Sequence, residues 1–273
     1  MRIRRVSVLI DGGFFLKRLP KIVERNFCDS PEAVAKSARV MCRRHVQRLI
    51  GESWEVKEES RWLDHVYRIF YYDASPYEGV SQHPISNRRV DFGRSTQASF
   101  RRDLFNALRR ERKFALRLGT VTKESDWRIS PNLTKKLLKT RELLPVLQVL
   151  LQESRSAPDL AREEQLAELE RLTKAWQEVG ERDVTFGLRQ KGVDMRIGLD
   201  IASMSLKNQI DTAILVSGDS DFVPAAKLAR REGVEFILDP LWQGVSPELS
   251  EHIDGLFTPL KRGAGAAEEG AGE

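Results

Sequence analysis

The sequence predicts an α/β fold built on a parallel sheet, and three observations lead to this prediction. Two continuous apolar runs, Val6 to Ile10 and Thr212 to Val216, each end in an acidic turn. A helical pattern from Phe222 to Arg231 connects the second run to a third, Val234 to Leu238. Apolar strands joined by a helix are typical of a parallel sheet with both faces covered. We therefore expect a parallel sheet with helices on both faces.

The chain before residue 122 alternates between helical and strand patterns. A short helix is predicted over Phe14 to Arg25, interrupted at Pro20, and a longer one over Pro31 to Ile50 with Ser30 as N-cap. The next predicted elements are a strand from Val66 to Tyr72, a loop from Gly79 to Gly93, an amphipathic helix from Gln97 to Lys113, and a strand from Phe114 to Val121. Near the end of the chain, Ile197 to Leu206 has apolar residues at helical spacing and leads into the strand at Thr212.

A different character marks the middle of the chain. Leu133 to Ser154 is leucine-rich, and Asp159 to Val179 carries apolar residues at helical spacing. These segments predict a helical hairpin inserted at about residues 123–187 into a single domain of residues 1–262. The remaining residues, 263–273, form a low-complexity tail that we expect to be disordered.

Composition limits the class of protein. The 273 residues carry 45 Lys and Arg against 40 Asp and Glu, a net charge of +5 that permits a polyanionic partner. No apolar run approaches the roughly 20 residues that span a bilayer, so we expect no membrane segment. Cys28 and Cys42 match no metal-binding spacing, which favours a reducing, cytoplasmic location.

Aspartates follow the predicted strands at their carboxyl ends. Asp11 follows the first strand, and Asp219 and Asp221 lie in the Ser-Gly-Asp-Ser-Asp turn after the strand at Thr212. Ligands of open parallel sheets bind beyond these ends, where close carboxylates repel one another unless a cation or shared protons relieve them. Oxygen ligands favour a hard cation such as Mg²⁺ or Mn²⁺. The alternative is structural: one aspartate caps the helix near Phe222, and Asp11 occupies a turn. Asp73, at the end of the second strand, is a weaker candidate and is assigned to a turn.

Four motifs together resemble a known family. The segments are VSVLIDGGFF at the start, FYYDASP, QKGVDM before a helix, and LVSGDSDF before another helix. With these, the chain resembles the NYN domain, in its LabA-like branch, over roughly Arg5 to Asp239 apart from the inserted hairpin. The resemblance implies a PIN-like, Rossmann-like fold and a metal-dependent phosphodiesterase acting mainly on RNA. It places the catalytic and metal-binding acids at Asp11, Asp194, Asp219 and Asp221, with Asp200 as a further metal ligand.

Two positions leave alternatives open. Asp194 and Asp200 are six residues apart and so point about 120° from one another on a helix, which means that they do not both face one metal ion. Many relatives carry asparagine three residues after the first aspartate, where this chain has Phe14. That departure leaves open a protein that binds nucleic acid without cutting it.

Basic residues between Arg88 and Lys113 are interleaved with phenylalanines, a pattern typical of a nucleic-acid groove. The alternative is that the arginines are solvated and the phenylalanines buried. The candidate nucleic-acid-binding residues are Arg88, Arg89, Arg94, Arg101 and Arg102, together with Lys191.

The leading hypothesis from sequence is a metal-dependent ribonuclease that uses Mg²⁺ or Mn²⁺. Its rivals are a non-cleaving RNA-binding regulatory protein and a protein-interaction module that uses the inserted helices. DNA as substrate, a small-molecule phosphatase and a homo-oligomer stay open. An esterase of the GDSL type is disfavoured for two reasons. Its nucleophile block, Gly218-Asp219-Ser220, comes late in the chain instead of near the N-terminus. Its late Asp-x-x-His motif is absent, because Leu249 and not an aspartate stands three residues before His252. No P-loop and no H-E-x-x-H motif is present.

Overall fold

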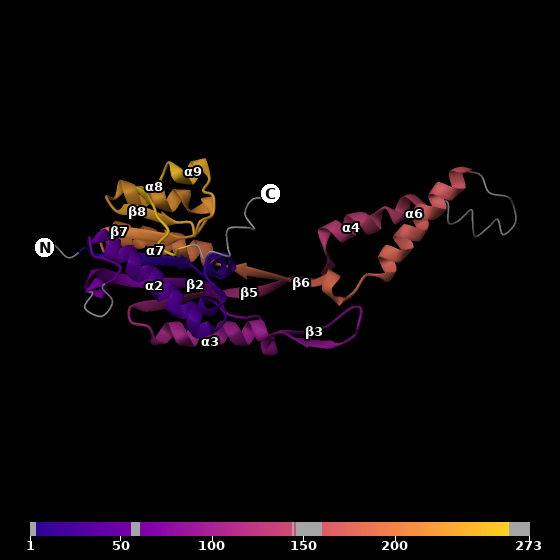
Figure 1. The fold of residues 1–273 in the computed structure, drawn as a ribbon, viewed down its shortest axis with the longest axis horizontal. Helices are drawn as coiled ribbons and strands as arrows, with labels where there is room; N and C mark the ends of the chain where they lie inside the picture. Colours follow the sequence, from indigo (N-terminus) through magenta and orange to yellow (C-terminus); the bar gives the residue numbers. More distant parts are fainter. Residues whose placement is uncertain (1–3, 56–60, 144, 146–159, 262–273) are drawn as a thin grey trace. The chain divides into compact units, whose positions relative to one another are not determined.

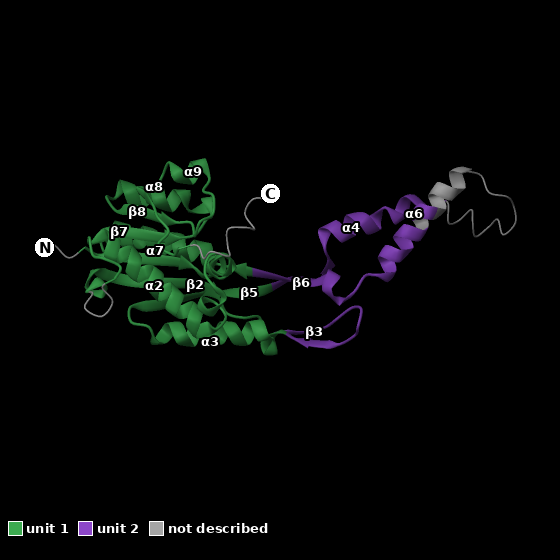
Figure 2. Cartoon of the chain, viewed as in Figure 1, with its two compact units in different colours: residues 1–78, 92–122, 190–273 green, residues 79–91, 123–189 purple. Residues whose placement is uncertain are grey.

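The computed structural model describes residues 4–55, 61–143, 145 and 160–261. It divides the chain into two compact units, which Figure 2 colours separately. The first unit comprises residues 1–78, 92–122 and 190–273, and the second comprises residues 79–91 and 123–189. The predicted tail, residues 263–273, and part of the predicted insertion lie outside the described residues.

A seven-stranded sheet runs in the order β6-β5-β2-β1-β7-β8-β9 (Figure 1). From β5 to β9, each neighbouring pair of strands is parallel, as the apolar runs predicted. The strands are β1 Val6–Asp11, β2 Val66–Ala74, β5 Phe114–Ile129, β6 Val184–Lys191, β7 Thr212–Val216, β8 Glu235–Asp239 and β9 Gly255–Leu256.

Helices cover both faces of the sheet in the first unit. Along β1, Val8 and Ile10 pack into one core with residues of α1, α2 and α3, whereas Leu9 packs into a second core with residues of α7 and α8. Because successive residues of a strand point to opposite faces, this alternation places one helical layer on each side. The helices are α1 Gly12–Arg18, α2 Pro31–Leu49, α3 Thr96–Arg110, α7 Val193–Leu206, α8 Val223–Arg231 and α9 Pro247–Ser250.

Serine caps open several helices, among them α2 and α3. Ser30 Oγ accepts a hydrogen bond from the backbone N–H of Ala33 at 3.2 Å, and Pro31 occupies the first helical position of α2. Ser95 Oγ accepts from Ala98 N at 3.2 Å and opens α3. The predicted cap at Ser30 is confirmed, because serine satisfies an amide that the first turn leaves unpaired.

Three predicted elements were wrong in extent or kind. The first helix ends at Arg18 instead of continuing to Arg25, and a short 3₁₀ turn, Leu19–Lys21, follows at the proline. The predicted loop from Gly79 to Gly93 contains an antiparallel hairpin, β3 Val80–Gln82 with β4 Arg89–Asp91. Strand β5 extends to Ile129, and its neighbour β6 was not predicted, because its exposed polar residues give no apolar run.

The second unit contains a helical pair, as predicted. Helices α4 Pro131–Leu138 and α6 Leu160–Gln177 contact one another, and Leu137 and Leu172 are buried. Three aromatic rings of this unit pack together. The ring centroids of His83 and Phe186 lie 4.6 and 5.2 Å from that of Trp127, and these residues come from the β3–β4 hairpin, β6 and β5, respectively. Across the described ranges, no helix has the length and apolar character needed to cross a membrane.

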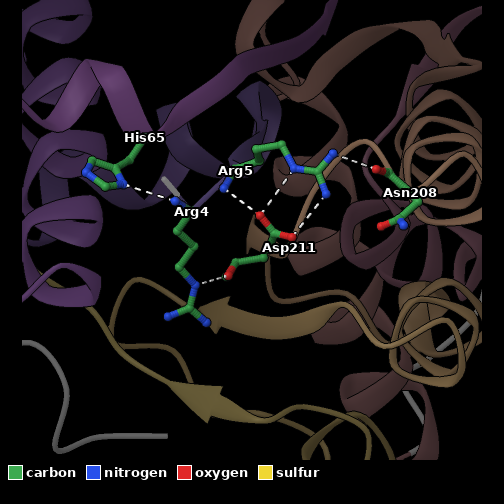
Figure 3. Close-up of polar contacts among 6 residues, drawn as sticks. Arg4, Arg5, His65, Asn208 and Asp211 are labelled. Carbon is green, nitrogen blue, oxygen red and sulfur yellow. Dashed lines mark hydrogen bonds and ion pairs between the residues drawn. The ribbon is translucent and has the colours of Figure 1, made fainter. Parts of the chain in front are cut away.

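A polar cluster fixes the amino end of β1 to the start of β7 (Figure 3). The backbone N–H of Arg5 donates to Asp211 Oδ2 at 2.8 Å, and its guanidinium donates to Asp211 Oδ1 at 3.1 Å and to the Asn208 carbonyl at 2.6 Å. Arg4 Nε donates to Thr212 Oγ1 at 2.8 Å. These bonds support the register of β1 against β7, and that register decides which residues meet at the opposite, carboxyl end of the sheet.

Candidate metal and nucleic-acid site

The strand register brings aspartates from three strands to one edge of the sheet. Asp11 is aligned with Tyr72 of β2, and the residue before it, Ile10, is aligned with Val216 of β7. Asp73 therefore follows one residue beyond Asp11 on β2, and the acidic turn after Val216 begins beside Asp11. The predicted convergence of strand-end carboxylates agrees with this register.

Asp11 is half-buried and caps α1. Its Oδ1 accepts a hydrogen bond from the backbone N–H of Phe14 at 3.1 Å. Burial raises the pKa of Asp11 to about 6, the hydrogen bond from Phe14 opposes the rise, and the negative charges of Asp194 and Asp73 add to it. Asp11 thus has a structural role as the cap of α1 instead of the turn position that the sequence offered as an alternative, and it also lies within electrostatic reach of two other acids.

Asp73 is fully buried, although the sequence ranked it as a weaker candidate and assigned it to a turn. Strand β2 continues to Ala74, so Asp73 belongs to the strand instead of a turn. Its Oδ1 forms an ion pair with Arg101 and accepts from Ala74 N at 2.7 Å and Gln190 Nε2 at 3.3 Å, while its Oδ2 is buried without a hydrogen-bond partner. Burial raises the pKa of Asp73, and Arg101 opposes the rise. The signal was available, since Asp73 ends an apolar strand just as Asp11 does.

Asp194, Asp219 and Asp221 form the other side of the group. Asp194 lies in the first turn of α7; partial burial raises its pKa, and the charges of Asp219 and Asp221 raise it further. Asp219 Oδ1 accepts the backbone N–H of Asp221 at 2.9 Å and so caps the 3₁₀ turn Ser220–Phe222. Both aspartates of the turn are exposed. Of the five predicted metal ligands, four are electrostatically coupled in a chain from Asp11 through Asp194.

Asp200 lies apart from this group. Its Oδ2 accepts a hydrogen bond from Tyr72 Oη at 2.9 Å and pairs with Arg117 Nε at 3.1 Å. Its charge, together with burial, raises the pKa of Tyr72. Of the two alternatives on the α7 helix, Asp194 is therefore the one that lies with the other carboxylates.

Two glycines let the chain approach closely at this edge. A Cβ at Gly12 would lie 2.6 Å from both the Tyr71 ring and the Tyr72 carbonyl oxygen. A Cβ at Gly218 would lie 2.8 Å from Gln243 Nε2 and 3.0 Å from the Phe14 ring. Phe14 therefore borders the acidic turn, where it offers an aromatic edge and no hydrogen-bonding group. Gln190 and Gln243 bring amides to the same edge, and no sequence motif pointed to either.

Several of the predicted basic residues contact other protein groups. Arg101 pairs with Asp73, and Arg102 donates to the Gly93 carbonyl at 2.7 Å. In the second unit, Arg88 pairs with Glu181 at 3.3 Å. The side chains of Arg89, Arg94 and Lys191 are exposed.

The donor chemistry suits a hard divalent cation, although the carboxylates do not close around one. The acidic side chains at this edge offer carboxylate oxygens, which hard cations prefer. One of these oxygens, Asp73 Oδ2, is buried without a hydrogen-bond partner. Within the described ranges, however, no three His, Cys, Asp or Glu side chains lie close enough together to hold a metal ion. Burial is the main cause of the raised pKa values of Asp11, Asp73 and Asp194; neighbouring acids raise those of Asp11 and Asp194 further, and Arg101 opposes the rise at Asp73.

Comparisons with known proteins give a family for part of the chain. No curated protein matches the sequence. A protein of unknown function from Vibrio parahaemolyticus RIMD 2210633, known from its crystal structure, aligns with a TM-score of 0.35 and 13% identity over 94% of each chain, which is too weak to bear on the fold. A family model matches the segment that runs from α6 past β9 and includes Asp194, Asp219 and Asp221; Asp11 and Asp73 precede it. Residues 159–260 match the NYN domain, of the PIN-like nuclease superfamily.

Proposed function

We propose that this protein is a metal-dependent ribonuclease whose site is the carboxyl edge of the sheet. The observation that carries the proposal is the strand register, which brings Asp11, Asp73 and the turn of Asp219 and Asp221 to that edge; the charges of Asp219 and Asp221 also act on Asp194. Carboxylates with perturbed pKa values gather at functional sites. Their mutual repulsion destabilises the fold unless a bound ligand such as a cation offsets it. The NYN match supports a nuclease-like hydrolase, and the LabA-like branch remains part of the proposal.

Asp11, Asp194, Asp219 and Asp221 are the residues that would hold Mg²⁺ or Mn²⁺. Such an ion supplies a Lewis acid that stabilises charge on the phosphodiester and lowers the pKa of water. Asp219 is held in place by its bond to Asp221 N, and both side chains are exposed, so that a polyanionic substrate can reach them. Asp73 lies behind Asp11 as a buried acid whose charge Arg101 offsets. Asp200 is left out of the ligand set, since Tyr72 and Arg117 bind it.

RNA is the proposed substrate, and the exposed cations are its proposed contacts. Lys191 ends β6 next to Gly192 and α7, so it lies near the helix that carries Asp194. Arg94 is exposed just before α3. In the second unit, Arg88 and Arg89 are proposed to contact RNA through their exposed side chains, and charge-driven contacts of this kind weaken as salt rises.

A non-cleaving RNA-binding protein is the second candidate, favoured by Phe14 and by the open spacing of the acids. Phe14 places an aromatic edge beside Gly218. In this case the carboxyl edge would bind RNA and contribute no chemistry.

A cleavage assay separates the two candidates. Labelled single-stranded RNA is incubated with the purified protein in Mn²⁺, Mg²⁺ or EDTA, alongside Asp219→Asn. The ribonuclease proposal predicts products with a metal ion, none in EDTA, and a loss of roughly 100-fold or more in the variant. RNA that binds but stays intact in every metal would instead establish the regulator. Cleavage that survives in a well-folded Asp219→Asn protein would remove Asp219 from the mechanism.

A further inference from the structure

A cavity of about 280 Å³ lies among the helices on one face of the first unit. Its walls are largely apolar and include Leu16, Leu19 and Val34 together with the ring of Phe100. Two polar side chains, Gln97 and Arg101, also line it. An apolar cavity with a few polar groups is the usual form of a small-ligand site.

Helix direction places this cavity towards the carboxyl edge of the sheet. Helices α2 and α3 lead into the parallel strands β2 and β5, so their first turns lie at the edge where those strands end. Val34, Gln97, Phe100 and Arg101 all belong to the first two turns of these helices. Arg101 lines the cavity, and its guanidinium pairs with Asp73, which follows the residue of β2 that is aligned with Asp11. The cavity and the acidic edge are thus linked through one side chain.

Size and lining select the occupant. A volume of about 280 Å³ falls just below the roughly 300–1,000 Å³ of pockets for drug-sized ligands, which favours one planar ring system over a complete nucleotide. Proteins bind unstacked bases of single-stranded RNA by stacking them on aromatic rings and hydrogen-bonding their edges. Phe100 supplies the ring. The Gln97 amide can donate and accept, and Arg101 has further N–H groups besides the one that Asp73 accepts.

We propose that this cavity binds one unstacked base of single-stranded RNA whose backbone passes over the acidic edge. The identity of the substrate class rests on the proposed function, whereas the cavity and its link to Asp73 do not. The pocket would give the enzyme a preference for the nucleotide placed there, because a base held in the cavity fixes which phosphodiester lies at the carboxylates.

Binding is tested in EDTA, where no metal-dependent cleavage occurs. The probe is a short single-stranded RNA that carries 2-aminopurine, whose fluorescence rises when it leaves the base stack. Gln97→Ala and Phe100→Leu are compared with Asn106→Ala, which removes an exposed amide from the same helix outside the cavity. We expect the fluorescence rise to disappear and Kd to weaken roughly 5- to 100-fold in Phe100→Leu, with a smaller loss in Gln97→Ala. Circular dichroism checks that each variant is folded. Variants that bind like Asn106→Ala would overturn the proposal.

Alkylation of Cys28 gives a second measurement on the unmodified protein. Cys28 lines the cavity and is partly exposed, whereas Cys42 is fully buried and burial raises the pKa of its thiol, so iodoacetamide should label Cys28 selectively. RNA bound in the cavity should slow this labelling several-fold, and an unchanged rate with RNA bound would contradict the proposal. Labelling slowed equally by free adenine or by DNA would reassign the cavity to a free base or to DNA.

If the cavity results hold but no metal ion supports cleavage, the ribonuclease proposal alone fails. If cleavage occurs and neither Phe100 nor Cys28 responds, the cavity proposal alone fails.

Discussion

At the scale of single residues, the charge of Asp11 costs folding free energy. The pKa of Asp11 is about 6 in the folded protein, against roughly 3.9 in an unfolded chain, so the folded state binds the proton more tightly. The stability that the protonated form contributes is present below about pH 4 and is lost as the pH rises through about 6. Asp11→Asn should therefore raise the free energy of unfolding above pH 6 by about 1–3 kcal/mol, because asparagine also caps helices well.

Urea unfolding in EDTA between pH 4 and pH 8 measures this difference. The gain should shrink to near zero at pH 4, where the wild-type carboxyl is protonated. Asp103→Asn, which removes an exposed carboxylate of α3, should show no comparable gain. An Asp11→Asn protein that is less stable than the wild type at every pH would show that the carboxylate stabilises the fold.

The sequence predicted which strand ends carry acids, but only the fold distinguishes them. Asp11, Asp219 and Asp221 were found because acids follow apolar strands. Asp73 was assigned to a turn because the predicted strand ended two residues too early. Periodicity could not choose between Asp194 and Asp200; the choice depends on Tyr72 and Arg117, which come from β2 and β5 far away in the chain.

At the scale of elements, two helical glycines should respond oppositely to alanine. At Gly12 the new Cβ would lie 2.6 Å from the Tyr72 carbonyl oxygen, and this clash is hard to relieve because a backbone atom cannot easily move away. We therefore expect Gly12→Ala to lower the free energy of unfolding by roughly 1–3 kcal/mol. At Gly198 of α7 nothing lies within 4 Å, and Gly198→Ala should stabilise by about 0.5–1 kcal/mol, because alanine favours the helix.

Thermal unfolding of the two variants tests this contrast. Equal effects of the two alanines would mean that the close contact of α1 with β2 does not exist in solution.

The elements that the sequence predicted well are those with a clear pattern of apolar residues. Strand β7 was predicted to the residue, and α2 within one residue, because an apolar run and a capped amphipathic pattern mark them. The hairpin of β3 and β4 was missed because both strands are short, polar and paired only with each other. Nothing local in the sequence indicated the extension of β5 or the existence of β6.

At the scale of the whole molecule, a buried contact between a histidine and an aspartate joins segments far apart in the chain. His45 Nε2 of α2 lies 2.8 Å from Asp239 Oδ2 at the end of β8, and both side chains are at most 2% exposed. Asp239 Oδ1 also accepts from Leu241 N at 3.0 Å and Thr258 Oγ1 at 2.6 Å. A fourth strand-end carboxylate is thereby bound within the protein instead of joining the acidic group.

Removing one partner of this pair should be costly. His45→Ala is expected to lower the free energy of unfolding by roughly 3–5 kcal/mol, because the Asp239 charge would stay buried without its partner. Urea denaturation at pH 7 measures the loss. Arg61→Ala, which breaks the exposed pair with Asp64, is the control and should leave stability nearly unchanged. A loss for His45→Ala no larger than this control would contradict a structural role for the pair.

The central claim is that the carboxyl edge of the sheet is a metal-dependent ribonuclease site, and two aspartates of one helix test it most directly. Initial rates of RNA cleavage in Mn²⁺ are compared for the wild type, Asp194→Asn and Asp200→Asn. Asp194 is coupled to Asp219 and Asp221, whereas Asp200 is bound by Tyr72 and Arg117. We predict a loss of roughly 100-fold or more for Asp194→Asn and a rate within a few-fold of the wild type for Asp200→Asn. Full activity in a folded Asp194→Asn protein, or an equal loss in both variants, would contradict the account.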